Sequence, residues 1–352
     1  MEKIKTYLVT GGAGFIGANF VKYMLKKYDD TVNIVVLDKL TYAGNLITLK
    51  DELNRIQFIK GDINNKELIE FIFHEFKIDI VVNFAAESHV DRSIENSKVF
   101  LNTNILGTHN LLEVAKDNWE TRDCQYREEV CFLQVSTDEV YGSLGHEGCF
   151  TELSPLDPKS PYSASKASAD MIAKAFYFTY NFPVVITRCS NNYGPYQFPE
   201  KLIPLMIKNI LEGKKLPVYG NGRNIRDWLY VEDHVRAIDM VVRKGKFGEV
   251  YNIGGHNEQE NITVVKKVID IIKELVEKEN NYRKLLEIEV EQVNYNLIEY
   301  VKDRLGHDFR YAIDPRKINK EVGWEPRIKF QDGLYRTIKW YLDNITWLKD
   351  LG

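Results

Sequence analysis

The feature that most constrains the fold is a regular alternation, over the first 190 residues, of short apolar segments with longer helical patterns. Most of the apolar segments lack the period-two pattern of strands with one face in water, which indicates strands buried on both faces. This alternation predicts an α/β fold with a doubly wound parallel sheet and right-handed crossovers. The predicted strands are Ile4–Thr10, Val32–Leu37, Ile56–Ile59, Ile78–Phe84, Val130–Val135 and Val184–Arg188, and the predicted helices are Phe15–Tyr28, Lys66–Phe76, Val99–Asn118 and Pro161–Tyr180.

The second half of the chain has a different texture. Turn-rich segments such as Asn191–Pro195 and Tyr219–Gly222 become common after Cys189. We expect residues 1–190 to form the main domain, with residues 228–256 or so returning to it. Residues 191–352 are expected to form mainly a smaller lobe that closes over a ligand. Helical patterns recur there at Glu232–Arg243, Thr263–Glu277, Pro315–Val322 and Asp332–Asn344.

Composition excludes several classes of protein. A formal net charge of −4 gives no global field toward nucleic acid or an anionic membrane, so any bound anion must be held by a local cluster. The four cysteines form no C-x-x-C pair and the histidines form no close cluster, so no metal is implied. No apolar run approaches the roughly 18 residues of a membrane span. Residues 1–3 lead directly into an apolar segment, so we expect a cytoplasmic protein without a secretory leader.

A glycine-rich turn follows the first predicted strand. Gly11, Gly14 and Gly17 stand between this strand and a helix, where glycines let the backbone approach a pyrophosphate at the helix N-terminus. Asp38 ends the second strand, 21 residues after Gly17, where an acid hydrogen-bonds the adenosine ribose. A carboxylate there would repel a 2′-phosphate, so the predicted cofactor is NAD rather than NADP. Asp62, after the third strand, is either an adenine contact or a turn aspartate.

Tyr162 and Lys166 form a Y-x-x-x-K pair within a predicted helix, where positions i and i+4 share one face. A tyrosine has an ordinary pKa of about 10, and a neighbouring ammonium favours its phenolate. Such a phenolate can take the proton of a substrate hydroxyl while hydride leaves the same carbon. Together with the glycine turn and Asp38, this pair resembles the short-chain dehydrogenase/reductase superfamily, in its extended branch that handles nucleotide sugars. The resemblance covers nearly the whole chain and implies a Rossmann-type sheet with a smaller C-terminal substrate-binding lobe.

Two adjacent carboxylates follow the fifth predicted strand, in the sequence Thr137-Asp138-Glu139. Epimerisation removes and returns one hydride and leaves such a pair unexplained. A 4,6-dehydration also needs a base for the C5 proton and an acid for the departing C6 hydroxyl. The stretch resembles the motif of the dTDP-glucose 4,6-dehydratase family. That resemblance implies that Asp138 is the general acid, that Glu139 is the base and that Thr137 holds the C4 hydroxyl near Tyr162.

Three further segments are similar to strings of the same family: Asp38–Asn45, Phe84–Ser93 and Arg188–Gln197. The resemblance implies a set of NAD contacts in these segments and around the glycine turn. The implied set is Gly11, Gly14, Phe15, Ile16, Gly17, Asp38, Lys39, Leu40, Thr41, Asp62, Ile63, Phe84, Ala85, Ala86, Glu87, Ser88, Thr103, Tyr162, Lys166 and Asn192.

A nucleotide-sugar substrate carries a diphosphate, for which an arginine offers two donors. Arg226, Arg304 and His307 are candidates for this contact, and for the arginines the resemblance favours phosphate contact over surface ion pairs. Leu305 departs from the family, which usually has proline there. A preference for thymine over uracil rests on the resemblance alone. The implied substrate contacts are Ser88, Thr137, Asn191, Lys201, Leu202, Pro217, Val218, Tyr219, Arg226, Asn261, Asp303, Arg304, Leu305, Gly306 and His307.

The expected activity is therefore that of an NAD-dependent hydro-lyase, a dTDP-glucose 4,6-dehydratase. A UDP-hexose 4,6-dehydratase or 4-epimerase on the same fold is the alternative, and a non-catalytic NAD-binding sensor is a third hypothesis. The resemblance also implies a homodimer, built by packing the helices at Val99–Asn118 and Pro161–Tyr180, and a place in making deoxysugars such as rhamnose.

Overall fold

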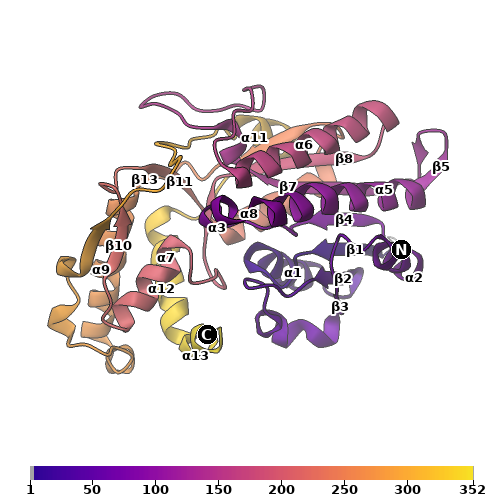
Figure 1. Ribbon diagram of the computed structural model, residues 1–352. Helices are drawn as coiled ribbons and strands as arrows, with labels where there is room; N and C mark the ends of the chain where they lie inside the picture. The colour runs from indigo at the N-terminus through magenta and orange to yellow at the C-terminus, as the bar shows by residue number, and fades with distance from the viewer. Residues whose placement is uncertain (1–3, 352) are drawn as a thin grey trace.

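A seven-stranded parallel sheet forms the centre of the computed structural model, which describes residues 4–351. The strand order is β3-β2-β1-β4-β7-β8-β12, so the order reverses between β1 and β4 (Figure 1). In open sheets of this Rossmann type, ligands bind at that switch point, beyond the carboxyl ends of the strands. The strands are β1 Lys5–Thr10, β2 Val32–Asp38, β3 Gln57–Lys60, β4 Ile80–Asn83, β7 Cys131–Thr137, β8 Val184–Cys189 and β12 Val250–Ile253.

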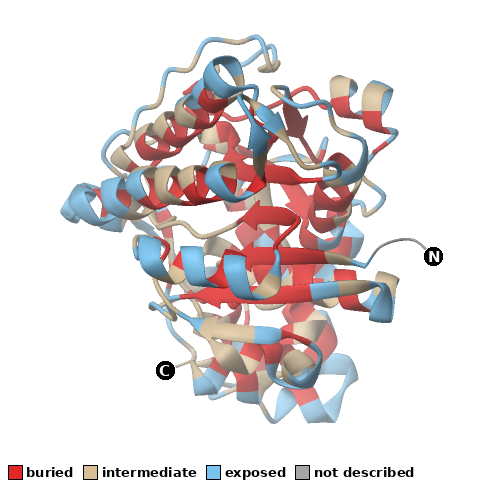
Figure 2. Ribbon diagram, turned by 90° about the vertical axis from the view of Figure 1, so that its right-hand side faces the viewer, coloured by how far each residue is buried: buried red, intermediate tan, exposed pale blue. Residues whose placement is uncertain are grey.

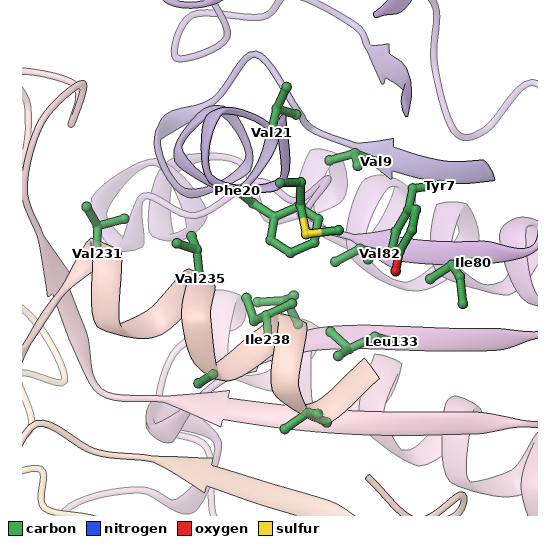
Figure 3. Packing of buried hydrophobic residues seen from close by; sticks show 14 of the residues in the cluster. Tyr7, Val9, Phe20, Val21, Ile80, Val82, Leu133, Val231, Val235 and Ile238 are labelled. Atoms are coloured by element: carbon green, nitrogen blue, oxygen red, sulfur yellow. The ribbon is translucent and has the colours of Figure 1, made fainter. Parts of the chain in front are cut away.

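Helices cover both faces of this sheet. Successive strand residues point to opposite faces, so that Val9 joins the core beneath α1 (Phe15–Tyr28) and α8 (Val231–Lys244), whereas Leu8 joins the core beneath the opposite helices. Figure 3 shows the first core, where side chains of α1 and α8 meet those of the central strands. The opposite face is covered by α2 Lys66–Phe76, α5 Thr108–Trp119 and α6 Pro161–Tyr180. In Figure 2 most strands are buried along most of their length, which explains why their sequences lack a polar alternation, whereas the edge strand β3 is intermediate or exposed throughout.

The predicted elements of this half are confirmed. All six predicted strands form, and α1, α2 and α6 have the predicted bounds. The predicted helix at Val99–Asn118 is a longer helical stretch that joins α4 (Ser97–Phe100) to α5 through a π-helical segment at Leu101–Gly107. Sequence periodicity did not predict this π-helical segment. Two short elements complete this part, α3 Val90–Glu95 and the hairpin β5 Glu120–Arg122 with β6 Gln125–Tyr126.

The remaining elements build a lobe with its own apolar core. Its principal helices are α7 Leu202–Leu211, α9 Asn261–Lys278 and α12 Phe330–Asp343, and two small sheets pair β10 with β14 and β11 with β9 and β13. Within residues 228–256, α8 packs on α1 and β12 extends the main sheet beside β8. A domain boundary near residue 190 stays a prediction. The other bounds are β9 Asn191–Tyr193, β10 Leu216–Tyr219, β11 Ile225–Tyr230, β13 Glu258–Glu260, β14 Ile298–Val301, α10 Asn280–Arg283, α11 Arg316–Val322 and α13 Ile345–Asp350.

Across residues 4–351, none of the helices combines the length and the apolar character that a membrane crossing requires.

Candidate active site

One cavity lies beyond the carboxyl ends of β1, β2, β4, β7 and β8, at the switch point of the sheet. It brings together residues far apart in the sequence, from the glycine turn after β1 to Lys201 before α7. Every predicted cofactor residue except Leu40 lines this cavity, and so do all five predicted catalytic residues. Of the predicted substrate residues, Ser88, Thr137, Asn191 and Lys201 line it, and the others lie outside its wall.

The glycine turn is shaped by close backbone approach. Gly11 has a φ of +65°, and a Cβ on it would lie 2.7 Å from the backbone nitrogen of Ala85. A Cβ on Gly17 would lie 2.3 Å from the carbonyl oxygen of Gly11, so a side chain at either position would push the turn apart. Gly14 is the N-cap of α1 and places the free backbone amides of its first turn at the cavity. These features form the cradle that a pyrophosphate requires.

Two carboxylates lie beside this cradle. Asp38 accepts hydrogen bonds from the backbone nitrogens of Ala13 at 2.9 Å and Leu40 at 2.8 Å. Burial raises the pKa of Asp38, and these backbone donors oppose that shift. Asp62 pairs with Lys39 at 2.7 Å; burial acts to raise its pKa, but the hydrogen bonds from Lys39 and Asn64 outweigh burial and lower it. Because Lys39 is occupied by Asp62, its charge is partly neutralised beside Asp38, which favours an unphosphorylated ribose.

Tyr162 and Lys166 lie one turn apart on α6, whose first turn is held by a capping box between Ser160 and Ser163. Lys166 donates to the carbonyl oxygen of Val135 at 2.6 Å, and burial lowers its pKa. Burial raises the pKa of Tyr162 well above its ordinary value, and the nearby Glu139 raises it further. Ionisation of this phenol therefore needs additional positive charge in the cavity.

The acid pair follows β7 directly. Thr137 caps a short 3-10 turn over Asp138–Tyr141, where its hydroxyl accepts from the Glu139 nitrogen at 3.3 Å and lies 3.3 Å from Oδ1 of Asp138. Burial raises the pKa of Asp138 well above its ordinary value, and the charges of Glu139 and Asp227 add to this effect. Burial also raises the pKa of Glu139, but Arg226, Lys201 and Arg304 oppose the shift. The surroundings thus separate the pKa values of the two neighbours, so that Asp138 keeps a proton more readily than Glu139.

Asn104, within the π-helical segment, connects the cofactor side of the cavity to α6. Its amide exchanges hydrogen bonds with the backbone of Glu87 at 2.9 and 3.0 Å and donates to the hydroxyl of Ser165 at 2.8 Å. Ser165 in turn donates to the carbonyl oxygen of Tyr162 at 2.7 Å. The π-helical turn therefore places a side chain that fixes α6 against the loop after β4, and no sequence pattern indicated this role of Asn104.

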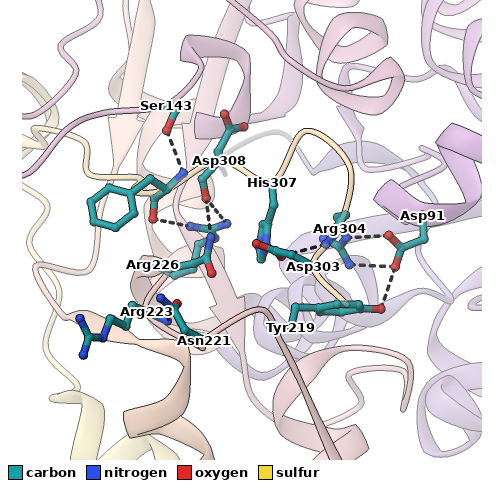
Figure 4. Close-up of polar contacts among 12 residues, drawn as sticks. Asp91, Ser143, Tyr219, Asn221, Arg223, Arg226, Asp303, Arg304, His307 and Asp308 are labelled. Atoms are coloured by element: carbon teal, nitrogen blue, oxygen red, sulfur yellow. Dashed lines mark hydrogen bonds and ion pairs between the residues drawn. The ribbon is translucent and has the colours of Figure 1, made fainter. Parts of the chain in front are cut away.

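The predicted diphosphate-binding residues lie together on a separate surface outside the lining of this cavity. It is formed by β10, β11 and residues 303–308, and we call it the second wall (Figure 4). Arg304 pairs with Asp91 at 2.6 Å, and its guanidinium lies 5.1 Å from the centre of the Tyr219 ring. Arg226 donates to the carbonyl oxygen of Asp308 at 3.0 Å. Leu305, at the position where the family usually has proline, is 72% exposed and contributes nothing to the cavity wall.

His307 lies between these two arginines in Figure 4. Its Nδ1 contacts Asp303 at 2.7 Å, and burial lowers its pKa, so the ring is neutral near pH 7. A neutral imidazole can hydrogen-bond a phosphate but adds no charge to it.

Several buried polar atoms at the cavity have no protein partner among the described residues. In folded proteins such atoms are rare and indicate a missing ligand or water. Those that belong to residues lining the cavity are Ser136 Oγ, Asp138 Oδ2, Ser190 Oγ, Asn191 Oδ1 and Gln197 Oε1. Together with the glycine cradle, they fit a large polar ligand such as NAD with a sugar.

Sequence reasoning missed part of the cavity wall. Most of the missed residues lie one or a few positions from a predicted contact, where the motif itself was the available signal. Phe198 and Glu200 lie beyond the motif of Arg188–Gln197, and nothing in their own pattern indicated a site. The missed residues are Leu37, Ala43, Gly44, Gly61, Val135, Ser136, Cys189, Ser190, Gln197, Phe198 and Glu200.

The fold and the cavity define a short-chain dehydrogenase/reductase, in which a glycine cradle and a Tyr–Lys pair share one cleft. The model of the family described as GDP-mannose 4,6 dehydratase matches residues 8–337. The dTDP-glucose 4,6-dehydratase of Salmonella typhimurium is 50% identical, over 98% of this chain and 94% of that enzyme. The chain therefore belongs to the dTDP-glucose 4,6-dehydratase family.

Solved structures agree with this assignment. The dTDP-glucose 4,6-dehydratase of Bacillus anthracis, solved in complex with NAD, has a TM-score of 0.85 at 50% identity and covers 99% of this chain and 100% of its own. The Streptomyces venezuelae enzyme of the same name, also with NAD, has a TM-score of 0.87 at 43% identity, with coverage of 99% and 100%. The UDP-glucose 4-epimerase of Thermotoga maritima has a TM-score of 0.81 at 26% identity, with coverage of 97% and 99%, so the same fold also carries epimerases.

Proposed function

We propose that this chain is a dTDP-glucose 4,6-dehydratase that uses NAD. The observation that carries the proposal is the placement of Asp138 and Glu139 in the same cavity as Tyr162 and Lys166. A Tyr–Lys pair alone serves oxidation and epimerisation equally well. The adjacent acid and base supply what elimination of water requires in addition.

The residues divide the chemistry among them. The glycine turn and Asp38 would hold NAD, which would supply the acceptor for hydride from C4 and its donor to C6, together with a positive charge that favours the Tyr162 phenolate. Tyr162 takes the proton of the C4 hydroxyl, and Lys166 stabilises the resulting charge. Glu139 then removes the C5 proton, which the new C4 ketone has made acidic.

Asp138 completes the elimination. It gives its proton to the C6 hydroxyl, which leaves as water while the C5–C6 double bond forms. Glu139 returns a proton to C5 as C6 is reduced, so that the base is regenerated. Burial raises the pKa of Asp138 well above its ordinary value because its charged form is poorly solvated, and a raised pKa suits a general acid. The product is dTDP-4-keto-6-deoxyglucose.

The nucleotide part of the substrate is assigned to the second wall. We place the diphosphate near Arg226 and Arg304, and the pyrimidine against Tyr219. For Arg304 this requires exchange of Asp91 for phosphate oxygens, because the two form an ion pair in this structure. Preference for thymine rests on the family relatives.

We also propose a cytoplasmic homodimer. The helical stretch of residues 97–119 and α6 lie side by side (Figure 1), and both expose large apolar side chains. Large exposed apolar side chains on neighbouring helices favour burial against a partner of the same kind. On the first stretch these include Val99, Leu101 and Leu106, and on α6 they include Met171 and Phe178.

The test is mass spectrometry of dTDP-glucose after incubation with the purified protein, without added NAD. A product lighter by one water supports dehydration by an enzyme that arrives with its cofactor. Unchanged mass, persisting when NAD is added, would contradict the proposal. Turnover of UDP-glucose instead, with the same loss of water or with conversion to its 4-epimer, would favour the alternative substrate or the epimerase.

A further inference from the structure

Three loop regions meet around Tyr42, one of which includes the short helix α3, and they come from segments far apart in the sequence. The guanidinium of Arg92, from α3, lies 3.6 Å from the centre of the Tyr42 ring. Phe198 contacts the same ring edge-on, with 5.7 Å between ring centres. Arg92 also pairs with Glu200 at 3.4 Å. We call Tyr42, Arg92, Phe198 and Glu200 the three-loop clasp.

The loop that carries Tyr42 is anchored at its far end to the glycine turn. The nitrogen of Asn45 donates to the carbonyl oxygen of Ala13 at 3.1 Å. A Cβ on Gly44 would lie 2.7 Å from Oδ1 of Asp38, so the loop folds tightly back over the end of β2. From this anchor it reaches to α3, which follows β4 on the other side of β1. The clasp therefore spans the switch point of the sheet.

Two residues of the clasp, Phe198 and Glu200, line the cavity that the glycine cradle opens into, and Tyr42 lies between two other lining residues. Thr41, Ala43, Phe198 and Glu200 all line that cavity together with Gly11. A second connection runs in parallel, because Lys201 donates to the carbonyl oxygen of Ser88 at 3.0 Å. A dinucleotide in the cradle would thus lie under a roof built from three separate segments of the chain.

The contacts of the clasp are of several kinds and share the same four residues. The Glu200 side chain is only 14% exposed, whereas that of Arg92 is 48% exposed. Water therefore reaches this ion pair mainly from the side of Arg92. The Glu200 carboxylate also accepts a hydrogen bond from Tyr42. Stacking of a guanidinium on an aromatic ring adds to the ion pair and to the contact with Phe198.

We propose that the three-loop clasp keeps NAD resident in its site through the whole reaction, so that Tyr42 and Arg92 are positioning residues that control cofactor release. This inference rests on the proposed function only in taking NAD as the ligand of the cradle. The chemistry gives a reason for it: a reduced cofactor that left before the last step would strand the dehydrated intermediate. Opening of the clasp is then the step that limits exchange of NAD.

The test follows exchange of the cofactor and needs no nucleotide sugar. The protein is loaded with radiolabelled NAD, chased with unlabelled NAD, and separated by spin filtration. Tyr42→Ala and Arg92→Ala should each release label about tenfold faster than the unaltered protein, the scale expected for loss of one stacked cation. Because Tyr42 and Arg92 contact each other, the increase in the double variant should be smaller than the product of the two single increases.

Two further variants act as controls. Tyr42→Phe keeps the ring contacts with Arg92 and Phe198 and removes only the hydroxyl, so it should release label much more slowly than Tyr42→Ala, which a general weakening of the loop would not do. Tyr295→Ala removes an exposed tyrosine of the second lobe and should exchange at the unaltered rate. Thermal melting of each variant shows that it is folded. Unaltered exchange in Tyr42→Ala and Arg92→Ala, or strictly additive effects in the double variant, would overturn the clasp. If the unaltered protein exchanges NAD more slowly than the two alanine variants but does not dehydrate dTDP-glucose, the result would instead count against the proposed function.

Discussion

Asp138 and Glu139 are neighbours in sequence with opposite proposed tasks. Asp138 is 2% exposed, and its Oδ2 has no partner among the described residues. Burial raises the pKa of both carboxyls, but nearby cations oppose the shift at Glu139, whereas the charges of Glu139 and Asp227 add to it at Asp138. A proton placed on this pair therefore rests on Asp138, so the side that donates and the side that accepts are set before substrate arrives.

Asp138→Asn should separate oxidation from elimination. The amide keeps the size of the side chain but has no proton to give to the C6 hydroxyl. We expect turnover to fall by about 10²–10⁴, the usual contribution of a general acid. Because oxidation at C4 needs only Tyr162 and Lys166, the absorbance of reduced nicotinamide should rise when dTDP-glucose is added. Glu139→Gln is the matched control and should accumulate the same signal. Loss of that signal in both variants would mean that the pair acts at oxidation.

The pH dependence follows from the same two carboxyls. Glu139 must be ionised to act, and its pKa is raised, so kcat/KM should fall as the pH drops through that raised value. Asp138 must be protonated, and its pKa is raised further, so kcat/KM should fall again as the pH rises through it. Both limbs of the bell should lie above the ordinary carboxyl pKa of about 4. Steady-state rates across the pH range, with stability checked at each point, measure this. An acid limb at the ordinary value would contradict the role of Glu139.

At the residue scale, sequence was a good guide where chemistry depends on local spacing. The Tyr162–Lys166 pair, the glycine turn and the acid pair were all predicted from neighbours along the chain. Glu200 and Phe198 could not be, because their role depends on contact with Tyr42 across more than 150 residues. The second wall lies between these cases: Arg304 was predicted, but its ion pair with Asp91 was not.

At the scale of elements, the helical stretch of residues 97–119 joins two features of the protein. Its π-helical segment turns Thr103 toward the cavity and Asn104 toward α6. The same stretch exposes Leu101 and Leu106 on its surface. One side of this helical stretch thus faces the candidate site, and another side is exposed and could contact a partner subunit.

Leu106→Glu should therefore weaken the proposed dimer. Leu106 is 54% exposed, so glutamate there costs little in an isolated chain. Within a helix interface it would bury a charge without a partner, which destabilises by several kcal/mol. Light scattering after size-exclusion chromatography should show a mass that moves from dimer toward monomer. Phe71→Glu, on exposed α2, is the control and should leave the mass unchanged. A monomeric unaltered protein would contradict the dimer itself.

Strands and helices of the first half were predictable because the burial of each follows a simple pattern along its own sequence. Fully buried strands are continuously apolar, and α1, α2 and α6 each have a buried stripe. The second lobe was harder. Strand β10 spans only Leu216–Tyr219 and pairs in parallel with Ile298–Val301, about 80 residues later, a pairing that neither segment indicates alone. Helix α7 was missed because its ten residues are apolar on most sides and follow a loop.

At the scale of the whole molecule, the arrangement of the main sheet and the second lobe explains how one cleft could serve both oxidation at C4 and elimination of water. The main sheet carries the cofactor cradle and the catalytic groups, and the second lobe contributes the arginines. Residues 303–308 come from late in the chain but reach Asp91, beside the cradle. The segments that we propose to hold cofactor and substrate therefore contact each other, which would let both remain in place while water leaves.

The central claim is that hydride removed from C4 returns to C6 of the same molecule. The most direct measurement is the fate of deuterium placed at C4 of dTDP-glucose, read by NMR of the product. We predict that the deuterium appears in the C6 methyl group, with a proton from solvent at C5. Deuterium that returns to C4 with no loss of water would identify an epimerase. Deuterium lost to free reduced cofactor would contradict a resident NAD.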